Sequence, residues 1–508
     1  MNRALVVAKV ERVMNWPWAP AMLAASRMTP AQSALIHAVR ARLGDKATVT
    51  DPNDIAPWLT DWRGRFHGRS AAILAPDSTE GVQFVVGRAQ ELGVALTPQG
   101  GNTSMVGGAT PPDDGSALIL SLRRMNRIRS IDPAAGLAVV EAGVILETLH
   151  NAAEAQGMRF PLTLGARGSA TVGGLVSTNA GGTQVLRFGT MRSLVAGIEA
   201  VLPDGSRHDG LTALKKDNRG YDLDHLLVGA EGTLGVVTAA TLRLVPAVVD
   251  RATGWLGVES PHRALKLLRA MESQSGSAIE SFELVPKLAL DLVLKHIPGT
   301  RPPLDEPHPW LVLVDYVAAT PDTATPALEA LMQGALTASL TQDAVVAANE
   351  AQSEAFWRLR DSISEAERAE GPTMAHDISV PVDAMPDFMQ SAAAQVEAAF
   401  PGVHCSAFGH LGDGNVHFHV NAPAGADGAR WRADVGEAAS RMVYDLVVAA
   451  GGSISAEHGI GQMKRGELER LSPPARMAAL RAIKRAFDPH ELMNPGKLVT
   501  LARGTPTA

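Results

Sequence analysis

Residues 98–108 read Pro-Gln-Gly-Gly-Asn-Thr-Ser-Met-Val-Gly-Gly and directly follow Val94–Thr97, an apolar run that predicts a β-strand. Because glycine has no Cβ, consecutive backbone N–H groups in such a loop can converge on an anion. A single glycine pair can equally mark an ordinary turn. The stretch becomes a candidate for binding a pyrophosphate when it is considered together with the two clusters that follow it.

The second glycine cluster, Gly165–Gly189, contains Gly173-Gly174 and Ser177-Thr178-Asn179-Ala180-Gly181-Gly182. The third cluster, Gly229–Gly235, leads into a predicted strand over 236–244. Neither Gly-x-Gly-x-x-Gly after a first strand nor Gly-x4-Gly-Lys-Ser/Thr is present, which argues against a nicotinamide Rossmann fold and a P-loop. Three clusters within residues 98–235 favour an extended phosphate-containing ligand over turns alone.

Composition limits the other function classes. The chain has 508 residues, of which 48 are glycine and one is cysteine, and its net charge is −7. A hydrophobic content of 46% predicts a folded protein of several domains, and the acidic balance argues against nucleic-acid binding. The lone Cys405 excludes an internal disulfide framework and a thiolate metal site, so a bound metal would have nitrogen and oxygen ligands. No apolar run is long enough to span a membrane, and we expect a cytoplasmic protein.

Alternating apolar runs and helix-length stretches predict an α+β protein with two large domains and a C-terminal segment that returns to the first. We expect an N-terminal extension over 1–27, a first domain over 28–247, a second over 248–450 and the returning segment over 451–508. Near the start of the first domain, Ala34, Leu35, Val39 and Leu43 follow helical spacing, which predicts a helix that Gly44 ends. Basic residues followed by an apolar stretch within 1–27 leave a signal or transit peptide as the alternative for the extension.

Residues 408–421 read Phe-Gly-His-Leu-Gly-Asp-Gly-Asn-Val-His-Phe-His-Val-Asn. From Asn415 onward polar and apolar residues alternate strictly, so His417 and His419 share the polar face of a predicted strand. The Gly-Asp-Gly turn can fold His410 back beside His417. An exposed strand is the alternative, but solvated faces favour Lys, Glu and Thr over histidine.

A second block, residues 453–461, places Glu457-His458 among glycines. Alone this pair is weak support for a site. Two histidines with one carboxylate, however, form a common nitrogen and oxygen ligand set for a divalent metal.

The three glycine clusters resemble the FAD-binding domain of the vanillyl-alcohol-oxidase-like flavoproteins. Over most of its length the chain is similar to the FAD-linked D-2-hydroxyacid dehydrogenases, the family that holds D-2-hydroxyglutarate and D-lactate dehydrogenases. The resemblance implies a two-subdomain FAD-binding domain, an α+β substrate domain with a metal site, and a C-terminal segment that returns to the flavin. It implies FAD contacts at Pro98, Gln99, Gly100, Gly101, Asn102, Thr103, Gly107, Gly108, Gly173, Gly174, Ser177, Thr178, Asn179, Gly181, Gly182, Glu231, Gly232, Gly235 and Asn494. Since Gln99–Gly108 has no His or Cys, we expect the FAD to be non-covalent.

The histidine blocks match the family signature Gly-His-x-Gly-Asp-Gly-Asn-x-His, followed later by Glu-His-Gly. The match implies that His410, His417 and Glu457 bind zinc or a similar ion, which chelates the 2-hydroxyl and C1 carboxylate of the substrate. It implies that His458 is the general base that takes the hydroxyl proton as the C2 hydride passes to flavin N5. A cation lowers the pKa of an alcohol, and an imidazole can accept the proton near neutral pH.

The resemblance also implies substrate contacts from Arg360, Ser364 and His419. A guanidinium suits a carboxylate, although an arginine on an exposed helix surface is the alternative. Two departures weaken an assignment to 2-hydroxyglutarate. Ala375 stands where D-2-hydroxyglutarate dehydrogenases usually have lysine, and His419 stands where the family often has asparagine.

We therefore expect an FAD-dependent dehydrogenase for a D-2-hydroxy acid, with D-2-hydroxyglutarate first and D-lactate or glycolate next. The expected partners are this small-molecule acid and an electron acceptor such as an electron-transfer flavoprotein or a quinone, not NAD. A homodimer is one possible assembly. Alternatives are an oxidase of the same fold, a flavin-binding subunit of a multi-subunit glycolate oxidase, and a zinc hydrolase. The hydrolase leaves the glycine loops unexplained.

Overall fold

The computed structural model describes residues 28–501, and it begins with helix α2 (Pro30–Leu43). The Thr29 side chain caps this helix, and Gly44, at a φ of 83°, ends it. Leu35 and Val39, which have helical spacing in the sequence, are fully buried. The predicted helix is thus confirmed. The extension over 1–27 lies outside the described residues.

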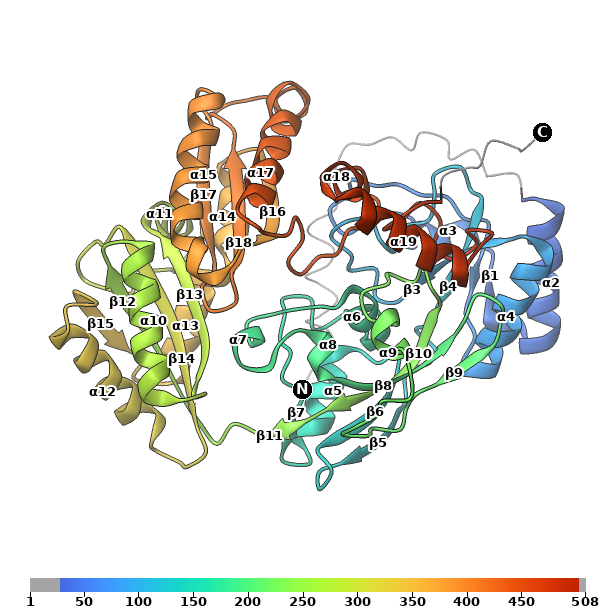
Figure 1. Cartoon of the computed structure of the whole chain (residues 1–508), viewed down its shortest axis with the longest axis horizontal. Helices are drawn as coiled ribbons and strands as arrows, with labels where there is room; N and C mark the ends of the chain where they lie inside the picture. Colours follow the sequence, from blue (N-terminus) through green and yellow to red (C-terminus); the bar gives the residue numbers. More distant parts are fainter. Residues whose placement is uncertain (1–27, 502–508) are drawn as a thin grey trace.

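Two larger sheets and one two-stranded sheet, β7 (Met158–Arg159) with β11 (Val245–Pro246), build the N-terminal unit (Figure 1). The four-stranded sheet has the order β1 (Thr48–Val49), β2 (Ile73–Leu74), β4 (Ala117–Ser121) and β3 (Ala95–Gln99). The five-stranded antiparallel sheet has the order β5 (Ile128–Asp132), β6 (Leu137–Glu141), β10 (Val236–Arg243), β8 (Val195–Val201) and β9 (Arg207–Asp209). Helices α2 and α4 (Thr79–Leu92) pack on the first sheet through one apolar core. Helices α5 (Leu146–Glu154) and α6 (Val172–Thr178) share a second core with the five-stranded sheet.

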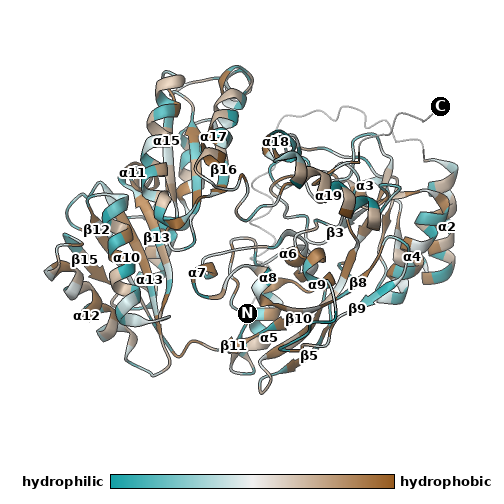
Figure 2. Ribbon diagram, viewed as in Figure 1, coloured by the Kyte–Doolittle hydropathy of each residue, from teal (hydrophilic) through white to brown (hydrophobic). Residues whose placement is uncertain are grey.

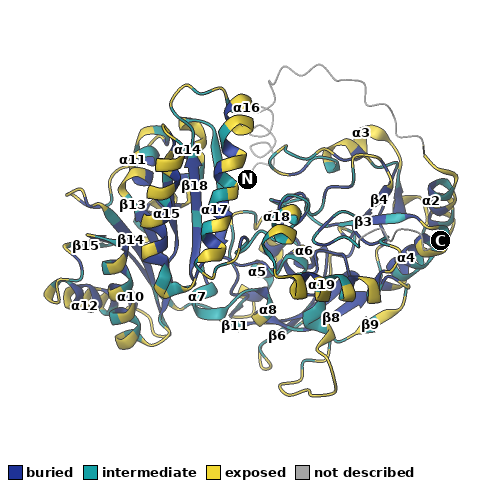
Figure 3. Cartoon of the chain, turned by 45° about the horizontal axis from the view of Figure 1, so that its top comes forward, coloured by how far each residue is buried: buried dark blue, intermediate teal, exposed yellow. Residues whose placement is uncertain are grey.

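A seven-stranded sheet builds the second unit, and its first strand begins at residue 250. The strand order is β15 (Asp343–Val346), β12 (Asp250–Val258), β14 (Trp310–Ala318), β13 (Ile279–Pro286), β17 (His404–His410), β18 (Asn415–Asn421) and β16 (Thr373–Ser379). Every pairing between neighbouring strands is antiparallel. The strands are apolar and buried between helices whose outer faces are polar and exposed (Figures 2 and 3).

Helices cover both faces of this sheet. On one face the apolar core joins the sheet to α10 (Pro261–Ser275), α12 (Ala324–Thr337), α15 (Met385–Ala399) and α17 (Glu437–Ala449). On the other face it joins the sheet to α11 (Lys287–His296), α13 (Glu350–Asp361) and α14 (Ile363–Glu370). Phe408 belongs to this second face, and so therefore does His410, two residues along the same strand.

The end of the chain returns to the N-terminal unit, as the sequence predicted. Helices α18 (Arg465–Leu471) and α19 (Pro474–Phe487) lie over that unit in Figure 1. Beyond them Met493 forms a parallel bridge with Leu96, and the Asn494 N–H donates to Leu96 O at 2.7 Å. The α+β class is confirmed. Within residues 28–501, none of the helices has the length and apolar composition needed to cross a membrane.

Candidate functional site

The histidine block folds into the antiparallel hairpin β17–β18, in which His410 pairs with Asn415. Val416, Phe418 and Val420 are fully buried on one face, as the alternation predicted. His417 lies on the opposite face with its ring centroid 5.4 Å from that of His410. His410 and His419 are buried, so the alternative of an exposed strand is wrong.

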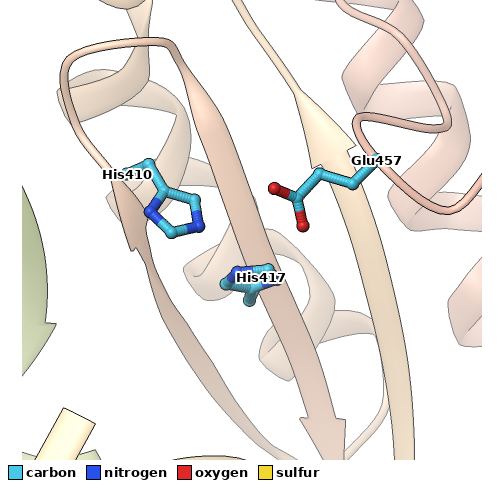
Figure 4. A group of neighbouring side chains, drawn as sticks. All are labelled: His410, His417 and Glu457. Carbon is cyan, nitrogen blue, oxygen red and sulfur yellow. The ribbon is translucent and has the colours of Figure 1, made fainter. Parts of the chain in front are cut away.

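Glu457 joins the two histidines from the returning C-terminal segment. His410, His417 and Glu457 each offer one possible ligand atom, and these three atoms lie within 4.8 Å of one another (Figure 4). The two imidazoles and the carboxylate point toward one another from three segments of the chain. The structure therefore brings the three predicted ligands together, although they span 48 sequence positions from 410 to 457.

Glu283 of β13 contacts this cluster through His410. The sequence analysis did not predict Glu283 as a site residue. Its Oε1 accepts a hydrogen bond from His410 Nδ1 at 2.6 Å, and its Oε2 accepts one from Arg360 Nε at 2.8 Å. This contact leaves Nε2 of His410 for an ion. A carboxylate behind a ligating histidine is the usual arrangement at metal sites.

Asp377 of β16 is the second residue that sequence reasoning missed. Its Oδ2 accepts the backbone N–H groups of Glu457 and His458, both at 2.9 Å, and lies 3.4 Å from His458 Nδ1. Lys464 Nζ donates to the Asp377 carbonyl at 3.1 Å. The turn that carries Glu457-His458 is therefore fixed to the edge strand of the seven-stranded sheet.

Charge at the site follows from burial and close partners. Burial opposes ionisation of Asp377, but His458 and Lys464 outweigh it and hold the pKa of Asp377 far below its usual range. Burial, together with Arg360 and His410, lowers the pKa of His417, and burial also lowers the pKa of His458. Both imidazoles are therefore neutral near pH 7. A neutral imidazole is the form that binds a metal or accepts a proton.

Arg360 and Ser364 come from the helices behind the hairpin. Arg360 lies in the last turn of α13, is 8% exposed and has its guanidinium 5.0 Å from the centroid of the Phe408 ring. The alternative of a surface arginine is therefore wrong. Ser364 lies half-buried in the first turn of α14.

His419 is held by a third missed carboxylate, Glu367 of α14, which contacts its Nδ1. Glu367 and His419 are both buried. Ala375, the departure from the lysine pattern, pairs directly with His419 across β16 and β18. The position therefore borders the site but contributes no charge.

The first glycine loop packs against the start of the second glycine segment. A Cβ on Gly100 would lie 2.1 Å from Thr171 Oγ1, and a Cβ on Gly101 would lie 1.9 Å from Ser169 O. Glycine at these positions thus allows two loops to meet. The predicted residues Pro98, Gln99, Gly100, Gly101, Asn102, Thr103, Gly107 and Gly108 all lie in or directly after β3.

The second segment connects the glycine loops with the histidine cluster. Gly173, Gly174, Ser177 and Thr178 belong to α6, which Asn179 caps at a φ of 50°, and Gly181 and Gly182 follow it. A Cβ on Gly181 would lie only 3.1 Å from Glu457 Oε1. The two predicted sites are therefore immediate neighbours.

Glu231 and Asn494 tie three segments together through their side chains. The Glu231 carboxylate accepts the N–H groups of Ile460 and Gly461, each at 2.7 Å. Asn494 Nδ2 donates to Glu231 O at 2.7 Å and to Gly108 O at 2.9 Å. Gly232 and Gly235, both at positive φ, complete the third cluster at this junction. A direct contact of these residues with a cofactor stays a prediction.

Groups at this junction fit an anionic cofactor. Among residues 28–501, Thr171 Oγ1 and Asn494 Oδ1 are buried without a hydrogen-bond partner. Lys497 is also buried, and burial together with Arg465 lowers its pKa to about 8. A pyrophosphate and flavin ring would supply the missing partners, so the loops are compatible with FAD. The histidine and glutamate donors are likewise compatible with a divalent ion.

Comparison with known proteins agrees with this geometry. A FAD binding domain family matches residues 70–210, and the C-terminal domain family of FAD linked oxidases matches residues 249–498. The mitochondrial D-2-hydroxyglutarate dehydrogenase of Bos taurus is 35% identical over 451 residues, which cover 89% of this chain and 81% of that protein. The D-2-hydroxyglutarate dehydrogenase of Xanthomonas citri pv. viticola is 36% identical over 88% of this chain and 93% of its own. The structure of p-cresol methylhydroxylase with substrate bound shares the fold, with a TM-score of 0.70 and 16% identity over 93% of this chain and 97% of that one.

Proposed function

This chain belongs to the FAD-linked D-2-hydroxyacid dehydrogenase family, and we propose that it oxidises D-2-hydroxyglutarate with the help of a divalent ion held by His410, His417 and Glu457. The observation that carries the proposal is the convergence of these three side chains beside His458. The glycine segment at Gly181 contacts the same cluster, which supports a shared site for cofactor and substrate.

Bound FAD would supply the acceptor for a hydride from C2 of the substrate, and an ion held by His410, His417 and Glu457 would lower the pKa of the 2-hydroxyl. His458 is placed to take the hydroxyl proton. Its Nδ1 faces the ionised Asp377, which leaves Nε2 as the proton acceptor and stabilises the imidazolium that forms. A proton acceptor must be neutral before the transfer, and the lowered pKa of His458 keeps its imidazole neutral near pH 7.

Arg360 is the group we assign to a substrate carboxylate. Glu283 binds only its Nε, which leaves the terminal guanidinium nitrogens for a second, bidentate partner. Because Glu283 holds Arg360 and His410 together, the carboxylate site and the ion site keep a fixed separation. Ser364 and His419 complete the substrate contacts in this proposal.

Purified protein should show the visible absorbance of oxidised flavin, and reduction of a dye should follow oxidation of D-2-hydroxyglutarate. EDTA should abolish turnover, and zinc should restore it. Glu457→Gln should lose the zinc-restored activity while it keeps flavin, whereas the control Glu437→Gln, at an exposed position on α17, should behave as the wild type. Protein that gains no flavin on reconstitution, or turnover that is insensitive to chelation, contradicts the proposal.

D-lactate and glycolate remain the alternative substrates, because Ala375 is neutral. A panel of D- and L-2-hydroxy acids decides among them, and Ala375→Lys should raise activity on dicarboxylic acids. A flavin-binding subunit without its own activity is the other alternative, and turnover by the isolated chain rejects it. The cytoplasmic location, the electron acceptor and a homodimer stay predictions.

A further inference from the structure

Asn415 is the buried first residue of β18, on the strand face that also carries His417. It lies in the hairpin between the two predicted ligands, and it pairs directly with His410 across β17 and β18. The proposed function gives Asn415 no role, although it stands in the middle of the histidine block.

The Asn415 side chain binds the edge strand β16. Its Nδ2 donates to Asp377 Oδ1 at 3.0 Å and to the Ile378 carbonyl at 2.9 Å. Because both partners are acceptors, the amide nitrogen is the group that faces them. Asn415 Oδ1 is buried and, among residues 28–501, accepts no hydrogen bond. The two donated bonds are therefore what holds this amide in place.

Asp377 uses its two carboxylate oxygens for different segments of the chain. Oδ2 accepts the N–H groups of Glu457 and His458, both at 2.9 Å. Oδ1 accepts from Asn415, which is its one donor within residues 28–501. The terminal torsion of an aspartate has no sharp minimum of its own, so a bond that fixes Oδ1 also fixes the direction of Oδ2.

The backbone of Asp377 is held independently of its side chain. Lys464 Nζ donates to the Asp377 carbonyl at 3.1 Å and to the Ile454 carbonyl at 2.8 Å. Strand pairing sets Asp377 opposite His417. Removal of the Asn415 side chain therefore leaves these backbone contacts in place and takes away the bond that orients Oδ1.

We propose that Asn415 is a positioning residue, which acts through Asp377 to hold the predicted base His458 at a fixed place beside the ion site. One carboxylate then joins the hairpin that carries two predicted ligands to the turn that carries the base, and Asn415 orients that carboxylate from the hairpin. Asn415 itself needs no contact with substrate or flavin. The inference rests on the proposed function, because His458 acts as a base only there.

Stopped-flow reduction of the flavin by D-2-hydroxyglutarate separates the chemical step from substrate binding. In protein loaded with FAD and zinc, Asn415→Ala should lower the limiting rate of flavin reduction about 10- to 100-fold, because a hydrogen bond to a charged group is lost. The dissociation constant of the substrate should change much less.

Asn421→Ala is the matched control for this variant. Asn421 also joins β18 to β16 through its side chain, which accepts a hydrogen bond from Thr373 Oγ1 at 2.7 Å. It lies at the opposite end of β18 and does not contact Asp377. The control should reduce flavin at the wild-type rate.

The double variant Asn415→Ala/Asp377→Asn shows whether the two residues act as one unit. If Asn415 acts through Asp377, the double variant should reduce flavin at about the rate of Asp377→Asn alone. Losses that multiply, or an Asn415→Ala rate equal to that of the control, overturn the inference.

Hydrogen exchange of the loaded protein gives a readout that needs no turnover. The amides of Glu457 and His458 should exchange faster in Asn415→Ala than in the wild type or in Asn421→Ala, while zinc affinity stays near the wild-type value. Unchanged exchange of these amides, or a loss of zinc affinity as large as the loss of rate, overturns the inference. If the wild type reduces no flavin with any 2-hydroxy acid but the amides exchange faster in Asn415→Ala, the positioning through Asp377 stands and the proposed function fails.

Discussion

Asp377 holds His458 at two points, since its Oδ2 accepts the backbone N–H of His458 at 2.9 Å and lies 3.4 Å from Nδ1 of the same residue. The side chain and the backbone of the predicted base are therefore oriented by one buried, ionised carboxylate. An imidazole held in this way presents its other nitrogen in a fixed direction. The relationship makes Asp377 a positioning residue whose importance can be measured.

Replacement of Asp377 by asparagine keeps its size and one acceptor oxygen but removes the charge. We expect kcat to fall about 10²- to 10⁴-fold, because the imidazolium loses its counter-charge, while KM changes much less. Dye-linked kinetics over a range of pH should also show a shifted profile, which a purely structural role would not produce. Asp305→Asn, at an exposed position, is the matched control. An unchanged kcat and pH profile would remove Asp377 from the mechanism.

Glu283→Gln tests the support of the ion site. Glutamine can accept only one of the two hydrogen bonds that Glu283 now accepts from His410 and Arg360. We expect zinc affinity to fall about 10- to 100-fold, measured by competition with a chromophoric chelator. Glu367→Gln is the matched control, because Glu367 is a buried carboxylate that holds His419 rather than a predicted ligand. Equal zinc affinity in the two variants would contradict the assignment of His410.

Glu280 joins the two units through ion pairs with Arg159 and Arg187. We therefore expect the free energy of unfolding to depend on the pH at which Glu280 ionises. Arg159 binds its carboxylate through two hydrogen bonds of 2.6 Å, and Arg187 adds one of 3.2 Å. Burial opposes ionisation, but Arg159, Arg251 and Arg187 outweigh it and hold the pKa of Glu280 below its ordinary 4.5. Glu280→Gln should lower the free energy of unfolding by roughly 2 kcal/mol at pH 7, because it removes the charged partner of the half-buried Arg159 and Arg187.

The sign of the pH effect follows from the lowered pKa. A folded-state pKa below the unfolded one means that the stabilisation is complete above about pH 4.5 and is lost as the pH falls toward the folded-state value. The difference in urea midpoint between wild type and Glu280→Gln should therefore be largest near pH 7 and shrink below pH 4.5. If the difference in urea midpoint grew as the pH fell, the arginines would not be what lowers the pKa of the Glu280 carboxylate.

Local patterns in the sequence predicted the histidine hairpin because they act within a few residues. Alternation from Asn415 assigns the faces of β18, and the Gly-Asp-Gly turn returns the chain so that His410 reaches His417. Helix α2 was likewise predicted from the spacing of apolar residues and its terminal Gly44. These features need no knowledge of distant parts of the chain.

The supporting carboxylates could not be predicted in the same way. Glu283 meets His410 across 127 sequence positions, and Asp377 meets His458 across 81. Strand pairing brings these groups together, and no local periodicity encodes which distant strand becomes a neighbour. For Glu283 the sequence did hold one signal, since Glu280 and Glu283 stand among the apolar residues of β13. A charged residue on a buried strand requires a partner.

Gly181 provides the last test, since it lies where the second glycine segment meets the predicted ion site. A methyl group there would lie 3.1 Å from Glu457 Oε1 and 3.3 Å from Val185 Cγ2, so the carboxylate would have to move by a few tenths of an ångström. We expect Gly181→Ala to weaken zinc binding and lower kcat/KM while the fold persists. Gly87→Ala on α4, where a Cβ meets nothing within 4 Å, should leave activity unchanged and slightly raise the thermal midpoint. Wild-type zinc affinity in Gly181→Ala would mean that Glu457 does not bind the ion in the position seen here.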